Sequence, residues 1–175
     1  IRAMELNIRN RLSYDKSWQQ VKLCALAILK DKEGIKSNML DRKETDRSYL
    51  FGRLLAIYEK TEAFTYNKDN ERITNAEKLW TSYLNKPVTM SMRLSDMTKP
   101  YDFKLLANEK TKKIRLILKQ DTSDVIGLIG DNYKFNSFET NKPLSSGFLF
   151  GYEAQKKELE YLYKNAMKES EEKND

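Results

Sequence analysis

The sequence predicts an all-α fold, a compact helical bundle of about six helices. Only 6 glycines and 3 prolines interrupt the 175 residues, and the alternation of apolar and polar residues that is typical of strands is nearly absent. Hydrophobic residues make up 39% of the chain, which is enough to bury one core. We therefore expect a single helical domain over residues 1–168, followed by a disordered acidic tail over residues 169–175.

The first helix is expected from Ser13 to Asp31, because apolar residues recur on one face and extend around the cylinder. The face consists of Trp18, Val21, Ala25 and Ile28, and the apolar residues outside this face are Leu23, Leu26 and Leu29. Such a helix is buried on several sides. Gly34 then provides a stop signal, and the polar stretch 36–45 predicts a loop.

The second helix is expected to begin after Asp46, an N-cap residue, and to run to about Phe64. Its core stripe consists of Leu50, Leu54 and Ile57. Gly52 and Ala56 lie one turn apart, and small residues at that spacing let another backbone come close.

Cap and proline signals place the next two helices. Thr74 can cap a third helix, which must end before Pro87 because the residue before a proline disfavours the helical region. A short fourth helix is expected from Pro87 to Asp96. Pro100 is expected to interrupt the chain again.

Two more helices complete the expected bundle. Asp102 opens the fifth, which runs to about Gln120 and is followed by a further helical piece over residues 121–130. The last helix starts at Ser145 or Ser146 and carries a bundle seam at four- and three-residue steps. The seam is formed by Phe148, Tyr152, Gln155, Leu159, Leu162 and Ala166.

The charge balance favours a polyanionic partner. The chain carries 32 Lys+Arg against 26 Asp+Glu, a net charge of +6 and a pI of about 9.2, so nucleic acid is the leading partner class. A soluble protein that is simply rich in lysine explains the charge alone equally well. No stretch approaches the roughly 20 apolar residues of a membrane span, and we expect a cytoplasmic protein without a membrane partner.

Residue counts exclude most catalytic sites. Without histidine and with one cysteine, Cys24, the chain cannot build the usual zinc sites or a histidine-based triad. No glycine-rich phosphate loop is present. The acidic residues at 41–46 and near the C-terminus are interleaved with lysines or lie in the expected tail, so we interpret them as solvated charge. We expect no enzyme activity, no catalytic residue, no metal and no cofactor.

The most informative local pattern is a cationic stripe on the expected fifth helix. Its members fall within an arc of about 80° and span about 22 Å: Lys104, Asn108, Lys112, Arg115 and Lys119. The opposite side carries Phe103, Leu106, Ile114 and Ile117. If that side packs on the core, the cations face outward and can follow a phosphate backbone. The competing interpretation is an ordinary solvated lysine face, although such faces usually mix in glutamates.

Two weaker sets of residues extend the predicted interface. Arg42, Lys43 and Arg47 lie on or beside the polar loop and could contact a nucleic-acid strand, although a surface loop explains them equally well. Four aromatic residues could stack on bases: Tyr66, Trp80, Tyr83 and Tyr101. For Trp80 and Tyr83, three residues apart on a helix, a core or subunit-interface position is the stronger expectation.

Two segments carry a resemblance to a known family: YLFGRLLAIYEK at 49–60 and FLFGYEAQ at 148–155. Together they resemble the C-terminal region of the large subunit of the type I-C CRISPR surveillance complex, Cascade. The matching residues are Gly52, Arg53, Ala56 and Glu59 in the first segment and Phe148, Gly151, Tyr152 and Gln155 in the second. Between them, LWTSYLNKPVTMSMRL resembles the family's helix, proline, helix passage, with Tyr83 and Pro87 in the expected places.

The resemblance covers roughly residues 45–165 and departs from the family pattern at Phe150 and Glu153. Both motif glycines permit close helix crossing, so we expect the motifs to report packing rather than a binding site.

The resemblance implies a helical domain without nuclease activity that helps to hold the displaced DNA strand and the R-loop in antiviral defence. Its implied partners are other Cascade subunits, namely the large subunit, the repeat backbone protein and a second small-subunit copy, together with target DNA recognised by the CRISPR RNA. In that family the same region is also made separately as a free small subunit. The length of the chain favours the free subunit, and an isolated C-terminal domain of the large subunit would have the same sequence features. The competing interpretation is a helical scaffold whose partners are proteins only.

Overall fold

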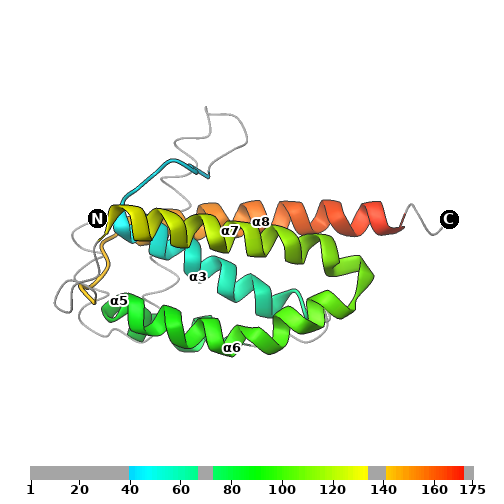
Figure 1. Cartoon of the computed structure of the whole chain (residues 1–175), viewed down its shortest axis with the longest axis horizontal. Coiled ribbons are helices and arrows are strands. Elements are labelled where there is room, and N and C mark those ends of the chain that lie inside the picture. Colours follow the sequence, from blue (N-terminus) through cyan, green and yellow to red (C-terminus); the bar gives the residue numbers. More distant parts are fainter. Residues whose placement is uncertain (1–39, 67–72, 134–140, 172–175) are drawn as a thin grey trace.

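A computed structural model describes residues 40–66, 73–133 and 141–171, which form one helical bundle (Figure 1). The described residues contain six helices and no strand, so the predicted all-α fold is confirmed. The helices are α3 (Arg47–Ala63), α4 (Asn75–Lys78), α5 (Trp80–Asn85), α6 (Pro87–Ala107), α7 (Glu109–Asn132) and α8 (Gly147–Glu171). The first expected helix, over residues 13–31, lies outside the described residues.

Helix α3 is the central element of the bundle and packs against α6, α7 and α8. It begins as predicted, because the Asp46 carboxylate accepts a hydrogen bond of 2.9 Å from the Tyr49 backbone N–H. It ends at the expected place, where Phe64 is the C-cap residue and its N–H donates to the Lys60 carbonyl. The whole run from Ser48 to Glu62 is buried, so α3 has no solvent-facing side.

Helices α3 and α8 cross at two glycines, as the sequence predicted. A Cβ atom on Gly52 would lie 2.8 Å from the Tyr152 backbone nitrogen and 2.9 Å from the Phe148 carbonyl carbon. A Cβ on Gly151 would lie 2.8 Å from the carbonyl carbon of Tyr49. Each glycine therefore faces the backbone of the other helix, and the two backbones approach more closely than any side chain would allow.

The seam of α8 is confirmed along its length. Phe148, Tyr152, Gln155, Leu159 and Ala166 are buried, and Leu162 packs at the edge of the core. The helix starts directly after Ser146 and continues to Glu171. Residues 169–171 of the expected tail are thus helical, and residues 172–175 lie outside the described residues.

The expected third helix is divided in two at Leu79, which lies between α4 and α5. Thr74 caps α4 as predicted, in a reciprocal capping box with Glu77. Helix α5 ends at Asn85, and Pro87 occupies the first turn of α6. The predicted stop before Pro87 is therefore confirmed.

The predicted break at Pro100 is wrong, and α6 continues through it to Ala107. A proline inside a helix removes one hydrogen bond, here to the carbonyl of Asp96. Asp96 and Pro100 are both on the exposed side of α6, where water can satisfy that carbonyl. The buried residues Thr98 and Leu105 hold the helix on the core on both sides of the proline.

The expected fifth helix from Asp102 to Gln120 is also wrong, because the chain turns at Asn108. This residue adopts an extended conformation, with φ −108° and ψ 114°, and joins α6 to α7. Thr111 supports the turn by donating from its hydroxyl to the Leu105 carbonyl at 2.9 Å. Figure 1 shows the result: α6 and α7 run antiparallel from this turn and diverge away from it, with α3 between them.

Candidate nucleic-acid interface

The turn between α6 and α7 carries the most basic segment of the described residues. From Lys104 to Lys119 the sequence contains six cations, at 104, 110, 112, 113, 115 and 119, and one acid, Glu109. Lys112 lies in the first turn of α7, where the helix dipole disfavours positive charge. Cations gathered at a helix N-terminus destabilise the free protein and favour a bound anion.

The structure changes the geometry that the sequence predicted for the cationic stripe. Lys104 lies in the last turn of α6 and Asn108 in the turn, whereas Lys112, Arg115 and Lys119 lie on α7. The predicted apolar side is wrong for Phe103, which is 65% exposed, and for Leu106, which is also exposed. Ile114 is buried as expected, and Ile117 packs at the edge of the core.

Asp102 of α6 lies against the cations of α7. The sequence pattern did not predict an acid at this surface. Both nitrogens of the Arg115 fork, Nε and Nη2, donate to the Asp102 carboxylate at 2.9 Å. The Lys119 ammonium is 3.7 Å from the same carboxylate. The Arg115 side chain is only 12% exposed, so its ion pair is partly shielded and holds α6 against α7.

Three lysines, two beside the turn and one farther along α7, remain open to solvent. Lys104 lies over the ring of Tyr101, 5.6 Å from its centroid. Lys112 pairs with Glu109, at 3.2 Å and three residues away on an exposed helix face, a contact of little energetic value. Lys119 is 56% exposed. All three ammonium groups are in contact with solvent, and those of Lys112 and Lys119 also pair with Glu109 and Asp102.

Arg42, a predicted phosphate ligand, is part of a polar network that enters the core. It donates to Asp121 of α7 at 2.6 Å, and this hydrogen bond raises the pKa of Arg42. The other Asp121 oxygen accepts from Gln155 of α8 at 2.7 Å. Gln155 in turn accepts from Arg53 Nε of α3 at 3.0 Å. The network joins the loop before α3 to three helices.

The other two loop residues have different surroundings. Arg47 donates from Nη1 to the Lys142 carbonyl at 3.0 Å and lies over the Phe51 ring, 5.2 Å from its centroid. It therefore holds the segment before α8 against α3. Lys43 is exposed, and its backbone N–H donates to the Asp41 carboxylate at 2.8 Å.

The predicted basic residues form two separate groups. Lys119, on the Asp102 side of α7, and Asp121, which binds Arg42, are two residues apart and so point about 200° apart around the helix. The structure places Lys104 and Lys112 on the two sides of the α6–α7 turn, and Arg115 and Lys119 farther along α7, where both contact Asp102 of α6. It places Arg42, Lys43 and Arg47 near the start of α3.

The aromatic candidates divide in the same way. Trp80 packs edge-on against Phe148 and Tyr152, with ring centroids 5.0 and 4.9 Å apart, so it is a core residue. Tyr83 is fully buried, as expected, and its hydroxyl donates to the Phe51 carbonyl at 3.0 Å. The rings of Tyr66 and Tyr101 contact each other, with centroids 6.0 Å apart.

The two motifs identified in the sequence contact each other along α3 and α8. Gly52 meets Phe148 and Tyr152, and Arg53 binds Gln155, as described above. Tyr152 donates from its hydroxyl to the buried Glu59 carboxylate, whose other oxygen is 2.9 Å from the Lys156 ammonium.

Burial alone would lower the pKa of Lys156, but the adjacent Glu59 carboxylate raises it above its usual value. Burial raises the pKa of Tyr152 well above its usual value. The predicted packing role of the motifs is thus confirmed, and it includes buried polar partners.

Within the described ranges, no group of three or more Cys, Asp or Glu side chains is placed to hold a metal ion. No helix in the same ranges is both long and apolar enough to cross a bilayer.

A comparison with protein families gives one match over most of the chain. The family described as "CRISPR-associated protein (Cas_Csd1)" matches residues 4–160. This range contains both motifs, the α6–α7 turn and the loop before α3. A search of curated proteins gave no match.

Proposed function

Because the chain belongs to the Cas_Csd1 family of CRISPR-associated proteins, we propose that it is a non-catalytic subunit of a type I-C Cascade complex. In this proposal it acts as the small subunit or as the equivalent C-terminal part of the large subunit. It binds the DNA backbone without regard to sequence and stabilises the displaced strand of the R-loop. Its partners are the large subunit, the repeat backbone protein and a second small-subunit copy.

The observation that carries the DNA-binding part is the concentration of exposed lysines at the α6–α7 turn. Lys104 and Lys112 present ammonium groups on the two sides of the turn, and Lys119 presents one farther along α7, beside Asp102. Point charges on flexible stems position a phosphate backbone but do not read bases. The absence of histidine from the chain and the solvated character of its exposed acids support the non-catalytic part.

A second candidate function, a scaffold with protein partners only, is favoured by the ion pairs of the arginines. Arg115 is held by Asp102 and Arg42 by Asp121, so both guanidinium groups already bind carboxylates of the protein. If the lysines also serve only solubility, no phosphate contact remains at this surface.

A salt titration distinguishes the two functions. The full chain is mixed with a labelled single-stranded oligonucleotide, and its affinity is measured by fluorescence anisotropy at increasing salt. Replacing Lys104, Lys112 and Lys119 together by Gln retains helix propensity and leaves Arg115 paired. If each lysine binds one phosphate, the slope of log affinity against log salt becomes shallower by about two, at roughly 0.7 per contact.

A matched variant removes the same charge elsewhere. Replacing Lys157, Lys164 and Lys168 of α8 by Gln changes the net charge equally and is expected to keep the wild-type slope. Equal loss in both variants would indicate general charge attraction, and no loss in either would favour the scaffold. In an assembled complex, the variant at the turn is expected to pair guide with target normally but to show faster collapse of the R-loop.

A further inference from the structure

Large apolar side chains face solvent on the outer side of α6 and α7. Phe103 of α6 is 65% exposed and Leu116 of α7 is 61% exposed, and Leu106 of α6 is exposed as well. Phe103 is two residues before the buried Leu105, so it lies on the opposite side of α6, away from the core. An aromatic ring in this position contributes little to the fold and is free to contact a partner.

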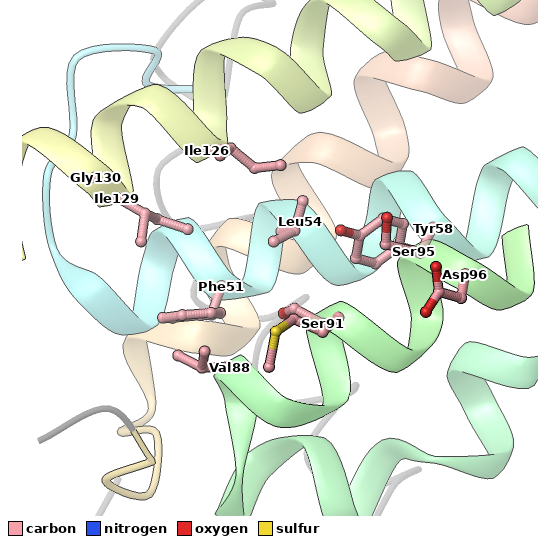
Figure 2. Close-up of a pocket in the computed structure, with 11 residues that line it drawn as sticks. Phe51, Leu54, Tyr58, Val88, Ser91, Ser95, Asp96, Ile126, Ile129 and Gly130 are labelled. Carbon is pink, nitrogen blue, oxygen red and sulfur yellow. The ribbon is translucent and has the colours of Figure 1, made fainter. Parts of the chain in front are cut away.

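The ion pair between Asp102 and Arg115 gives α6 and α7 a common outer surface near the turn. Figure 2 shows the part of the bundle where the two helices are apart: there Leu54 of α3 lines an open groove between Val88 and Ile126. Nearer the turn, the ion pair holds α6 against α7 instead.

Phe103 and Leu116 lie on this common outer surface. Phe103 directly follows Asp102, and Leu116 directly follows Arg115. One residue rotates the side-chain direction by about 100° around a helix. Because the two helices are antiparallel, this rotation turns both apolar side chains from the ion pair towards the same outer side of the hairpin.

Exposed lysines surround the apolar side chains. Lys99 lies one turn before Phe103 on α6, and Lys112 and Lys119 lie one turn on either side of Leu116 on α7. Their ammonium groups are 2.6, 3.2 and 3.7 Å from carboxylates of the protein. Pairs between solvent-exposed side chains are worth little, so a polyanion can displace these carboxylates.

A ring among lysines suits a ligand that is both flat and anionic. A single strand of nucleic acid offers phosphates to the cations and unpaired bases to the ring. In a duplex the faces of the bases are covered by their neighbours, so the ring has no base to stack on. A second copy of the chain fits this face less well, because a symmetric contact would bring its lysines against identical lysines.

We propose that Phe103 is a stacking platform for an unpaired base of a single DNA strand, with Lys99, Lys112 and Lys119 binding the phosphates around it. This inference rests on the proposed function and adds a preference for single-stranded over duplex DNA. The preference is independent of base identity, because every base has a π-face.

The test separates bases from phosphates. Phe103→Ala in the full chain is compared with the wild type for binding to three labelled probes of equal length: a single strand of mixed sequence, a strand of abasic sites, and a duplex. Loss of one base–aromatic stack is expected to weaken binding of the mixed single strand by about fivefold or more. Binding of the abasic strand and of the duplex is expected to stay unchanged, and Phe103→Trp is expected to retain the affinity of the wild type.

Tyr161→Ala is the matched control. Tyr161 of α8 is 63% exposed, much as Phe103 is, and its loss is expected to change the affinity for none of the probes. Because both side chains are exposed, both variants are expected to keep the wild-type Tm.

Four results would overturn the proposal. Equal weakening for the mixed and abasic strands would show that Phe103 does not contact bases. Wild-type affinity in Phe103→Ala, combined with a shallower salt slope on replacing Lys104, Lys112 and Lys119 by Gln, would remove the stacking and leave the proposed DNA binding intact. No binding of any probe by the wild type would remove both. A wild-type dimer that Phe103→Ala dissociates would assign the face to a second copy.

A photochemical crosslink provides a direct readout. A single strand that carries 5-iodouracil is irradiated in complex with the wild-type chain, and the crosslinked peptide is identified by mass spectrometry. The crosslink is expected in the peptide that contains Phe103 and is expected to disappear in Phe103→Ala. Crosslinks confined to other peptides would contradict the proposal.

Discussion

The close crossing of α3 and α8 predicts that Gly52→Ala destabilises the protein. The added methyl group would lie 2.8 Å from the Tyr152 nitrogen and 2.9 Å from the Phe148 carbonyl carbon. Because both atoms belong to the backbone, no side-chain rotation relieves the overlap, and α8 must move away from α3. Overpacking of this kind costs about 1–3 kcal/mol.

Two further terms affect the net change. Alanine in place of glycine improves helix propensity by about 1 kcal/mol. Separation of the helices also lengthens the 3.0 Å hydrogen bond from Arg53 to Gln155, and a buried polar group that loses its partner costs about 1–3 kcal/mol. The sum is a net loss of about 1–5 kcal/mol in the free energy of unfolding. For a chain of this size, each kcal/mol lowers the Tm by about 2–4 °C.

Gly127→Ala provides the matched control. Gly127 lies inside α7 and is exposed, and a Cβ atom added there would meet no atom within 4 Å. The same substitution there gains propensity without overlap and is expected to stabilise the protein by about 0.5–1 kcal/mol. Urea and thermal unfolding of both variants give the signs directly. If Gly52→Ala stabilises the protein as Gly127→Ala does, the close crossing of α3 and α8 is refuted.

The surface, the core and the composition give three other predictions. Asp102→Asn is expected to release Arg115 and Lys119 and to raise the affinity for single-stranded DNA. The slope of log affinity against log salt is then expected to steepen by about 0.7 for each cation that binds a phosphate. An unchanged slope would mean that Arg115 stays turned into the protein. Burial raises the pKa of Tyr58 to about 12. The pKa difference therefore contributes about 2–3 kcal/mol to the free energy of unfolding below the unfolded pKa of about 10, and this contribution is lost as pH rises towards 12. Measurements of unfolding at pH 9 to 12 should show this loss, and Tyr58→Phe should reduce it. The purified protein is expected to show no nuclease or ATPase activity with Mg²⁺ or Mn²⁺; metal-dependent cleavage lost on one Asp or Glu substitution would contradict this.

The sequence predicted the helix ends that depend on local interactions. Asp46 and Thr74 cap their helices with their own side chains, and Pro87 starts α6 because its missing N–H costs nothing in a first turn. These signals lie within four residues of the boundary they set, so a single sequence contains them.

The boundaries that depend on packing could not be predicted in this way. Pro100 remains helical because its exposed side is solvated and its buried neighbours hold α6 on the core. The turn at Asn108 contains neither glycine nor proline, and it is fixed by the packing of Ile114 and Leu118 in the core. Because apolar residues continue at helical spacing on both sides of the turn, the periodicity predicts one helix where the structure has two.

The same error affected the candidate interface. The sequence shows which residues are basic and how many of them lie near the turn, but its periodicity predicts a cationic stripe on one straight helix. Only after α7 folds back against α6 does Asp102 meet Arg115, thirteen residues later in the chain. The exposed lysines agree with the sequence analysis, whereas the role of Arg115 as a link between helices required the structure.

The pairing of α3 with α8 has a consequence for the order in which the protein can fold. Helical proteins usually fold fast because their contacts are local, yet here the central helix pairs with one that starts 84 residues after its end, from Ala63 to Gly147. On the ribosome, at about 5–20 residues per second, this interval takes roughly 4 to 17 s. During that time the apolar surface of α3 lacks its principal partner, so we expect the nascent chain to depend on chaperones until α8 emerges.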